Sequence, residues 1–131
     1  MIITDLLQID SIAEEILTTN KNIITVDMYD YTSAKKSSSS LCAVKVEIPD
    51  ITVENLVEFR KELEEVFDKN VNNLILVVCD NDMENHNNEY TLSKMRLILR
   101  PTDEKLHDPK IVWGVCGNTR GEGFTILVIV G

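Results

Sequence analysis

The stretch Ile23-Ile24-Thr25-Val26-Asp27-Met28-Tyr29-Asp30-Tyr31 joins a run of β-branched apolar residues to polar sequence. The apolar run predicts a strand, and Asp27 and Asp30 follow three residues apart where that strand ends. Strand ends present reactive groups, and paired carboxylates there can orient water or hold a cation. The alternative is that both aspartates cap the next turn or helix. On this stretch alone, capping is the favoured interpretation.

Composition restricts the classes of function. The 131 residues suit one domain with a single core, and the net charge of −9 argues against binding to nucleic acid or to an anionic membrane. The longest apolar runs, residues 74–79 and 124–130, are too short to cross a bilayer, and no secretory signal opens the chain. We therefore expect a cytoplasmic protein without direct membrane binding.

The cysteines and histidines do not predict a metal site. Cys42, Cys79 and Cys116 each lie in an apolar, strand-like segment, and no two have CxxC spacing. We expect buried core thiols in a reducing compartment. His86 and His107 lie in polar stretches, where we expect solvated side chains.

Apolar periodicity predicts helices over residues 4–18, 53–68 and 90–100. Strands are predicted over residues 23–26, 41–48, 74–79, 111–116 and 124–130. The last two strands flank a turn and are predicted to pair as a β-hairpin. The polar stretch 32–40 favours a surface loop over a short helix.

These elements together predict a single domain over residues 1–131 of the α/β class, α+β type. The predicted architecture has two layers, in which two helices pack on one face of a mixed sheet of four to five strands, after an N-terminal helix. All five glycines lie at or after Gly114, and none stands at a strand-to-helix junction. The chain therefore has no glycine-rich phosphate cradle and no self-contained nucleotide-hydrolysing site.

The element order and several motifs resemble the carboxy-terminal domain of FtsZ, the prokaryotic homologue of tubulin. Residues 7–16 look like the end of that family's core helix, and residues 25–31 look like the following loop, of the form Asn-x-Asp-Phe-Ala-Asp-Val. Residues 74–79 are similar to its central strand. Residues 110–115 and 124–131 are similar to its closing hairpin.

The resemblance implies a core-helix remnant at residues 1–20 and an activation domain at residues 21–131. In that family the loop enters the nucleotide pocket of the next subunit in a filament, where its two acids position water and a cation beside GTP. Asp27 and Asp30 would be those acids, acting in trans. Thr25 stands where the family has Asn, and it is the candidate nucleotide contact.

The resemblance further implies a cytoskeletal GTPase of cell division and septation, whose partner is the GTP-binding domain of an FtsZ-like subunit, with possible self-assembly. The chain alone would hold no cofactor and no complete active site; GTP and Mg²⁺ would be present in the assembled filament. Two alternatives stay open. One is a stand-alone, non-catalytic interaction module, and the other is a small ligand-binding or lyase-type α/β enzyme.

Overall fold

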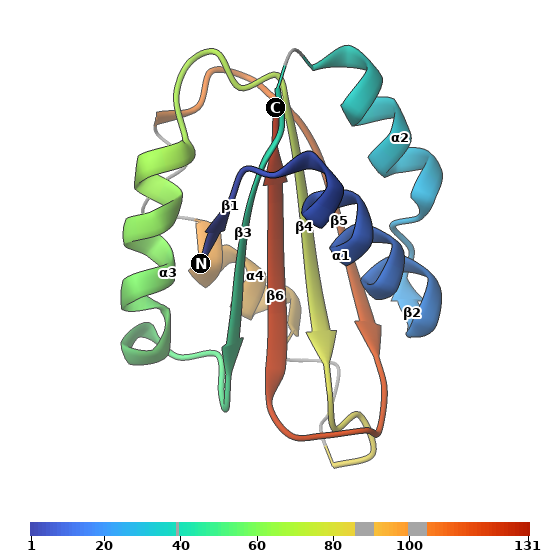
Figure 1. The fold of residues 1–131 in the computed structure, drawn as a ribbon. Coiled ribbons are helices and arrows are strands. Elements are labelled where there is room, and N and C mark those ends of the chain that lie inside the picture. Colours follow the sequence, from blue (N-terminus) through green and yellow to red (C-terminus); the bar gives the residue numbers. More distant parts are fainter. Residues whose placement is uncertain (39, 86–90, 100–104) are drawn as a thin grey trace.

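The computed structural model describes residues 1–38, 40–85, 91–99 and 105–131. Helices and strands alternate along most of the chain (Figure 1). In order they are β1 Ile2–Ile3, α1 Leu6–Thr19, β2 Lys21–Ile24, α2 Met28–Ser37, β3 Cys42–Ile48, α3 Val53–Val66, β4 Asn73–Asp80, α4 Thr91–Leu99, β5 Lys110–Gly117 and β6 Phe124–Val130.

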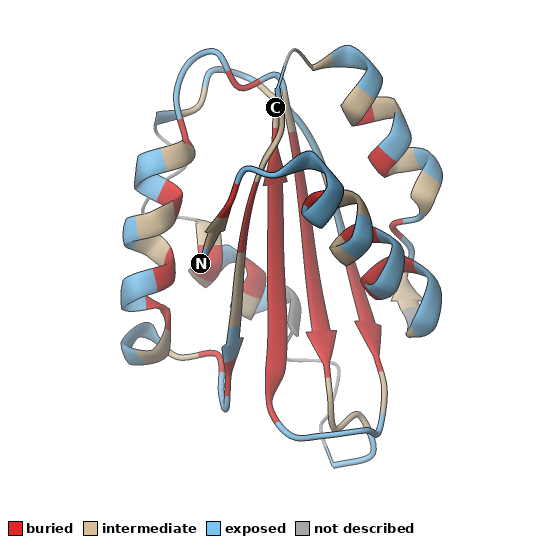
Figure 2. Cartoon of the chain, viewed as in Figure 1, coloured by how far each residue is buried: buried red, intermediate tan, exposed pale blue. Residues whose placement is uncertain are grey.

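The strands form one mixed sheet in the order β1-β3-β6-β4-β5-β2. β4 and β5 are parallel, and every other neighbouring pair is antiparallel. β6 and β4 occupy the centre, and Figure 2 shows both as buried along nearly their whole length. Continuous apolar strands of this kind need cover on both faces of the sheet.

Helices cover both faces. Leu74, Leu76 and Val78 of β4 pack in the apolar cluster of α3 and α4, whereas Ile75 and Val77 pack in the cluster of α1 and α2. The mixed sheet with helices is therefore confirmed, but the prediction of two layers and four to five strands needs correction to three layers and six strands. The cause is that successive side chains of each central strand point to opposite faces.

The predicted hairpin of the last two strands is wrong. Both strands exist, but β4 lies between them, parallel to β5 and antiparallel to β6. β6 pairs on its other edge with β3 along seven register positions, Ile48↔Phe124 to Cys42↔Val130. An almost entirely apolar strand gains more from burial between two neighbouring strands than from pairing with a single strand across a turn. The sequence of the turn does not show which of these pairings is the more stable.

The loop predicted over residues 32–40 is also wrong for most of its length, because α2 runs to Ser37. Tyr31 and Ala34 bury one side of this helix against the sheet. Lys35 and Lys36 lie in its last turn, where positive charge favours the helix dipole. Tertiary packing of these two apolar positions outweighs a polar composition that is typical of loops.

The predictions of buried thiols at Cys79 and Cys116 and of a solvated His107 are confirmed. Cys79 and Cys116 are buried, Cys42 is half-buried, and all three thiols are free. His107 is exposed, whereas His86 and the predicted helix residues 90 and 100 lie outside the described residues. Among the described residues, no three metal-ligating side chains gather, and no helix has the length and apolarity that a bilayer crossing requires.

Candidate functional site

Asp27 and Asp30, here called the aspartate pair, lie at the start of α2. The Asp27 carboxylate accepts a hydrogen bond from the Asp30 N–H at 3.1 Å, and the Asp30 carboxylate accepts one from the Asp27 N–H at 3.0 Å. This reciprocal capping box satisfies two backbone donors that the first helical turn leaves open. The capping alternative from the sequence is therefore confirmed as a structural role of the pair.

The backbone just before the pair is fixed by a close approach to β5. Val26 is buried, and a Cβ on Gly114 would lie 2.6 Å from both the Ile24 carbonyl oxygen and Val26 Cγ2. Only glycine leaves room for this crossing. Residues 25–31 and residues 110–115, which carry two parts of the family resemblance, are thus in contact.

A polar bridge holds α2 against α1. The Asp10 carboxylate accepts hydrogen bonds from the Tyr31 hydroxyl at 2.5 Å and from Lys35 Nζ at 3.0 Å on each oxygen. The Tyr31 hydrogen bond, followed by Lys35, holds the pKa of Asp10 below its usual value. Burial and the contact with Asp10 raise the pKa of Tyr31, so its hydroxyl stays protonated.

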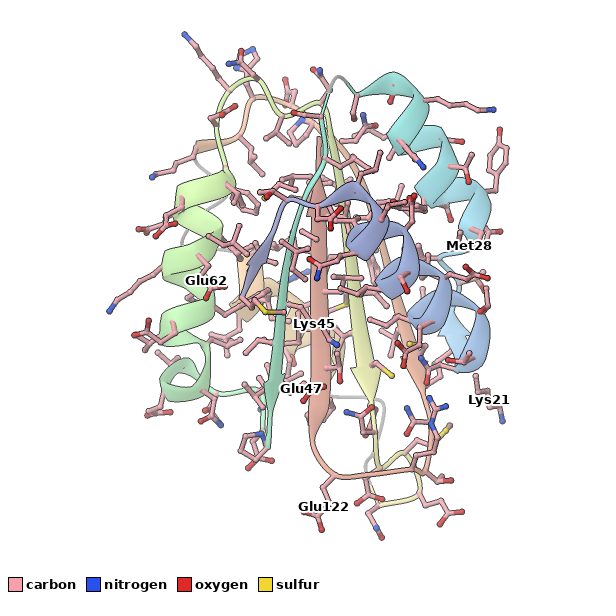
Figure 3. The ribbon with its side chains drawn as sticks, in the orientation of Figure 1. Lys21, Met28, Lys45, Glu47, Glu62 and Glu122 are labelled. Carbon is pink, nitrogen blue, oxygen red and sulfur yellow. The ribbon has the colours of Figure 1, made fainter. Side chains whose placement is uncertain are left out.

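The surroundings of the aspartate pair are open. Thr25 and Asp27 are exposed, Asp30 is half-buried, and 78% of the surface of Tyr29, which lies between the two acids in sequence, is exposed. Figure 3 shows Met28, in the first turn of α2, at the border of the molecule. The structure therefore brings Asp27 and Asp30 together at a surface that a second molecule can approach, with Thr25 on the same short segment.

The aspartate pair provides part of the ligand set that a hard cation requires. Mg²⁺ prefers oxygen ligands and is commonly held by one or two carboxylates together with phosphates and water. Asp27 and Asp30 provide two such carboxylates, and no third metal-ligating group joins them among the described residues. The donor set fits a cation only if a nucleotide supplies the remaining ligands.

A second polar site lies where β4 and β5 end, and the sequence did not predict it. Asn118 Nδ2 donates to Asn20 Oδ1 at 2.8 Å and to Asn81 Oδ1 at 3.1 Å, and Asn81 Nδ2 donates to Thr125 Oγ1 at 3.0 Å. Arg120 Nη2 also donates to Asn20 Oδ1, at 2.6 Å. We call these five residues the asparagine cluster.

The asparagine cluster lines an open pocket of about 680 Å³. Lys45, Glu47 and Glu122, labelled in Figure 3, lie on its walls. The hydrogen bonds of the cluster join four segments and link residues up to 100 apart in sequence. One sequence feature could have predicted the cluster: Asn81 and Asn118 each follow the end of a strand, at the carboxyl edge of two parallel strands.

Comparison with known proteins identifies the fold. No family model and no curated protein matches this chain. An empty FtsZ dimer structure from M. jannaschii matches with a TM-score of 0.59 at 15% identity, over 96% of this chain and 39% of that one. A tryptophan-to-tyrosine mutant of FtsZ from M. jannaschii matches with a TM-score of 0.55 at 13% identity, over 98% of this chain and 41% of that one.

The chain thus spans about two fifths of the length of each matched FtsZ chain. The match covers nearly the whole chain and agrees with the resemblance found in the sequence motifs. This chain has a fold like that of the FtsZ carboxy-terminal domain.

Proposed function

We propose that this chain is the activation domain of an FtsZ-like GTPase and supplies the aspartate pair in trans to the GTP site of an adjacent subunit. The observation that carries the proposal is the capping box, which fixes an exposed and a half-buried carboxylate at the start of α2 within an FtsZ-like fold. Under this proposal the protein works in the cytoplasm, as part of a cell-division filament that forms the septum.

The capping role leaves the carboxylates able to act. Asp27 uses Oδ1 and Asp30 uses Oδ2 in the capping box, and the second oxygen of each receives no hydrogen bond from the described residues. A carboxylate has about four acceptor positions, so each can bind a further donor or a cation. Asp27 and Asp30 would orient the attacking water, and Thr25 would contact the nucleotide.

The work of such a site divides naturally between two chains. Phosphoryl transfer depends mainly on positioning and on stabilisation of charge. A bound Mg²⁺ would neutralise charge on the GTP phosphates. The present chain lacks a glycine-rich phosphate cradle, so its acids become useful only when another subunit brings the nucleotide to them.

The test is GTP turnover by an FtsZ-type GTP-binding domain, measured alone and with this chain added. Asn is as good an N-cap residue as Asp, and an Asn at position 30 keeps a side-chain oxygen that can accept the Asp27 N–H. Asp27→Asn and Asp30→Asn should therefore keep α2 and remove the charge. We expect stimulation by the natural chain and roughly a hundredfold loss of it in either variant, the size typical of a lost general base or positioning group.

Asp5→Asn is the matched control. Asp5 caps α1 through a 3.1 Å bond from the Leu7 N–H, so this variant makes the same chemical change at another helix start. It should stimulate like the natural chain. Equal stimulation by the Asp27 and Asp30 variants would contradict a catalytic role for the pair.

A second candidate function is an interaction module of the same fold, in which the aspartate pair only caps α2. The capping box itself favours this reading, because it already explains both residues. If the chain is such a module, it should bind a folded, GTP-bound partner domain without stimulating GTP turnover. It also predicts that Asp27→Asn leaves the affinity unchanged.

A further inference from the structure

Two cysteines face each other across the parallel strands β4 and β5. Cys79 and Cys116 are register partners, and both pack in the apolar cluster beneath α1 and α2. The two side chains therefore lie side by side on the same face of the sheet. Neighbouring strands are about 4.8 Å apart, which lies within the range of Cα separations that a disulfide spans.

The two thiols have different surroundings. Cys79 lies at the wall of the pocket and accepts a hydrogen bond from Asn118 Nδ2 at 3.5 Å, with the Arg120 guanidinium nearby. The neighbouring Cys116 thiol, then Arg120 and Asn118, lowers the pKa of Cys79 against the effect of burial. The neighbouring Cys79 and burial raise the pKa of Cys116.

We propose that Cys79 and Cys116 are a redox pair, in which a peroxide-class oxidant reacts with Cys79 from the pocket and Cys116 then closes a reversible disulfide. The attacking group is the Cys79 thiolate, which is the nucleophilic form of cysteine. The partner thiol stands at the register position directly opposite on the neighbouring strand, so the second step requires no large rearrangement of the strands.

The chemistry balances in two steps. The Cys79 thiolate sulfur attacks one peroxide oxygen, the O–O bond breaks, hydroxide leaves, and the sulfur becomes a sulfenic acid. The Cys116 sulfur then attacks the Cys79 sulfur, the S–O bond breaks, and the thiol proton leaves with the hydroxyl group as water. Overall the two thiols lose two electrons and two protons, the peroxide becomes two molecules of water, and a dithiol reductant reverses the change.

Cys42 provides an internal comparison. It is more exposed than either member of the pair, and burial raises the pKa of its thiol. Its register partner on β6 is Val130, so no resolving thiol faces it. Simple accessibility would make Cys42 react first, whereas the proposal expects the Cys79–Cys116 disulfide to form first.

The experiment treats the folded chain with hydrogen peroxide and follows disulfide formation by mass spectrometry of peptides. Natural chain and Cys42→Ser should both form the Cys79–Cys116 disulfide, which a dithiol reverses. Cys116→Ser should accumulate a sulfenic acid at Cys79 that dimedone traps. Arg120→Gln should slow the reaction several-fold, because it removes a cation near the Cys79 sulfur.

Circular dichroism of each variant checks that it is folded before the reaction. If the folded natural chain forms no Cys79–Cys116 disulfide while Cys42 is oxidised, the proposal is overturned. Dimedone labelling at Cys42 alone in Cys116→Ser would overturn it equally. An unchanged rate in folded Arg120→Gln would overturn the assigned role of Arg120 in activating Cys79.

Discussion

The aspartate pair and the asparagine cluster are both polar sites at the ends of sheet strands, but they are built in opposite ways. The pair forms within four consecutive residues, and its two hydrogen bonds are exchanged between its own members. The cluster joins α1, β4, β6 and the segment after β5 through side chains that are far apart in sequence.

The two sites differ in how many of their polar groups are used within the fold. In the cluster, four hydrogen bonds join the cluster's own side chains and hold the strand ends to the end of α1. In the pair, capping uses one oxygen of each carboxylate, and the other oxygen accepts no hydrogen bond from the described residues. The pair is therefore the better candidate for chemistry with a partner, and the cluster is the better candidate for stability.

The largest expected effect comes from removing the support beneath the pair. Gly114→Ala places a Cβ against the backbone of Ile24 and the side chain of Val26. We expect a loss of about 3 kcal/mol in the free energy of unfolding, the upper end for forced overpacking. Urea unfolding measures it.

Gly121→Ala is the control for that change, because the nearest contact of its Cβ would be Asn81 Cβ at an ordinary 3.9 Å. It should alter the free energy of unfolding by less than about 0.5 kcal/mol. Equal effects of the two substitutions would show that the close approach at Gly114 does not fix the segment before the pair.

The second largest loss of stability is expected from a substitution that breaks the asparagine cluster. Asn118→Ala removes the donor shared by Asn20 and Asn81, and we expect it to lower the free energy of unfolding by about 2 kcal/mol, because both acceptors lose a partner in a half-buried site. Urea unfolding again provides the value. An Asn70→Ala substitution at an exposed position should change little, and a neutral Asn118→Ala would remove the structural role of the cluster.

A smaller effect separates capping from charge in the pair. Asp27→Ala should cost about 1 kcal/mol of unfolding free energy, the usual value for a lost helix cap. Asp27→Asn should cost only a few tenths of that amount, because the amide oxygen still accepts the Asp30 N–H. Thermal and urea unfolding of both variants check this order, and equal losses would show that charge rather than capping stabilises α2.

The smallest effect is a pH dependence of the bridge between α1 and α2. Because folding lowers the pKa of Asp10, its stabilising contribution is present above the ordinary value of 3.8 and is lost as the pH falls through the folded pKa. Because folding raises the pKa of Tyr31, its contribution is present below the ordinary value of 10.0 and is lost as the pH rises beyond it. Asp10 and Lys35 are partly exposed, so solvent screening keeps the change small.

Asp10→Asn is the variant that checks this dependence. Its free energy of unfolding, measured by urea titration from acid to neutral pH, should fall less steeply in acid than that of the natural chain. If the free energy of unfolding falls equally steeply in acid for the natural chain and the variant, the Asp10 bridge is not the cause of the pH dependence.

Local signals in the sequence predicted much of the fold. The apolar stripe of α3 and the alternation of β3 were sufficient to predict both elements, because each buries one face. The position of β6 between β3 and β4 was not predictable, since a uniformly apolar strand fits several neighbours equally well. α2 was missed because only Tyr31 and Ala34 form its buried side.

The same distinction holds for the candidate sites. The aspartate pair was visible in the sequence because its two members stand three residues apart, and its capping role follows from that spacing. The asparagine cluster was invisible, because Asn20, Asn81 and Asn118 meet only after the sheet has formed. The Cys79–Cys116 pairing likewise depends on the parallel register of β4 and β5.

The central claim is that the aspartate pair caps α2 and also supplies charge to a partner's GTP site. The most direct measurement takes unfolding free energy and stimulated GTP turnover from the same preparation of Asp27→Asn. We predict a stability close to that of the natural chain together with a loss of most of the stimulation. Unchanged stability with full stimulation would contradict the claim and leave the pair with its capping role alone.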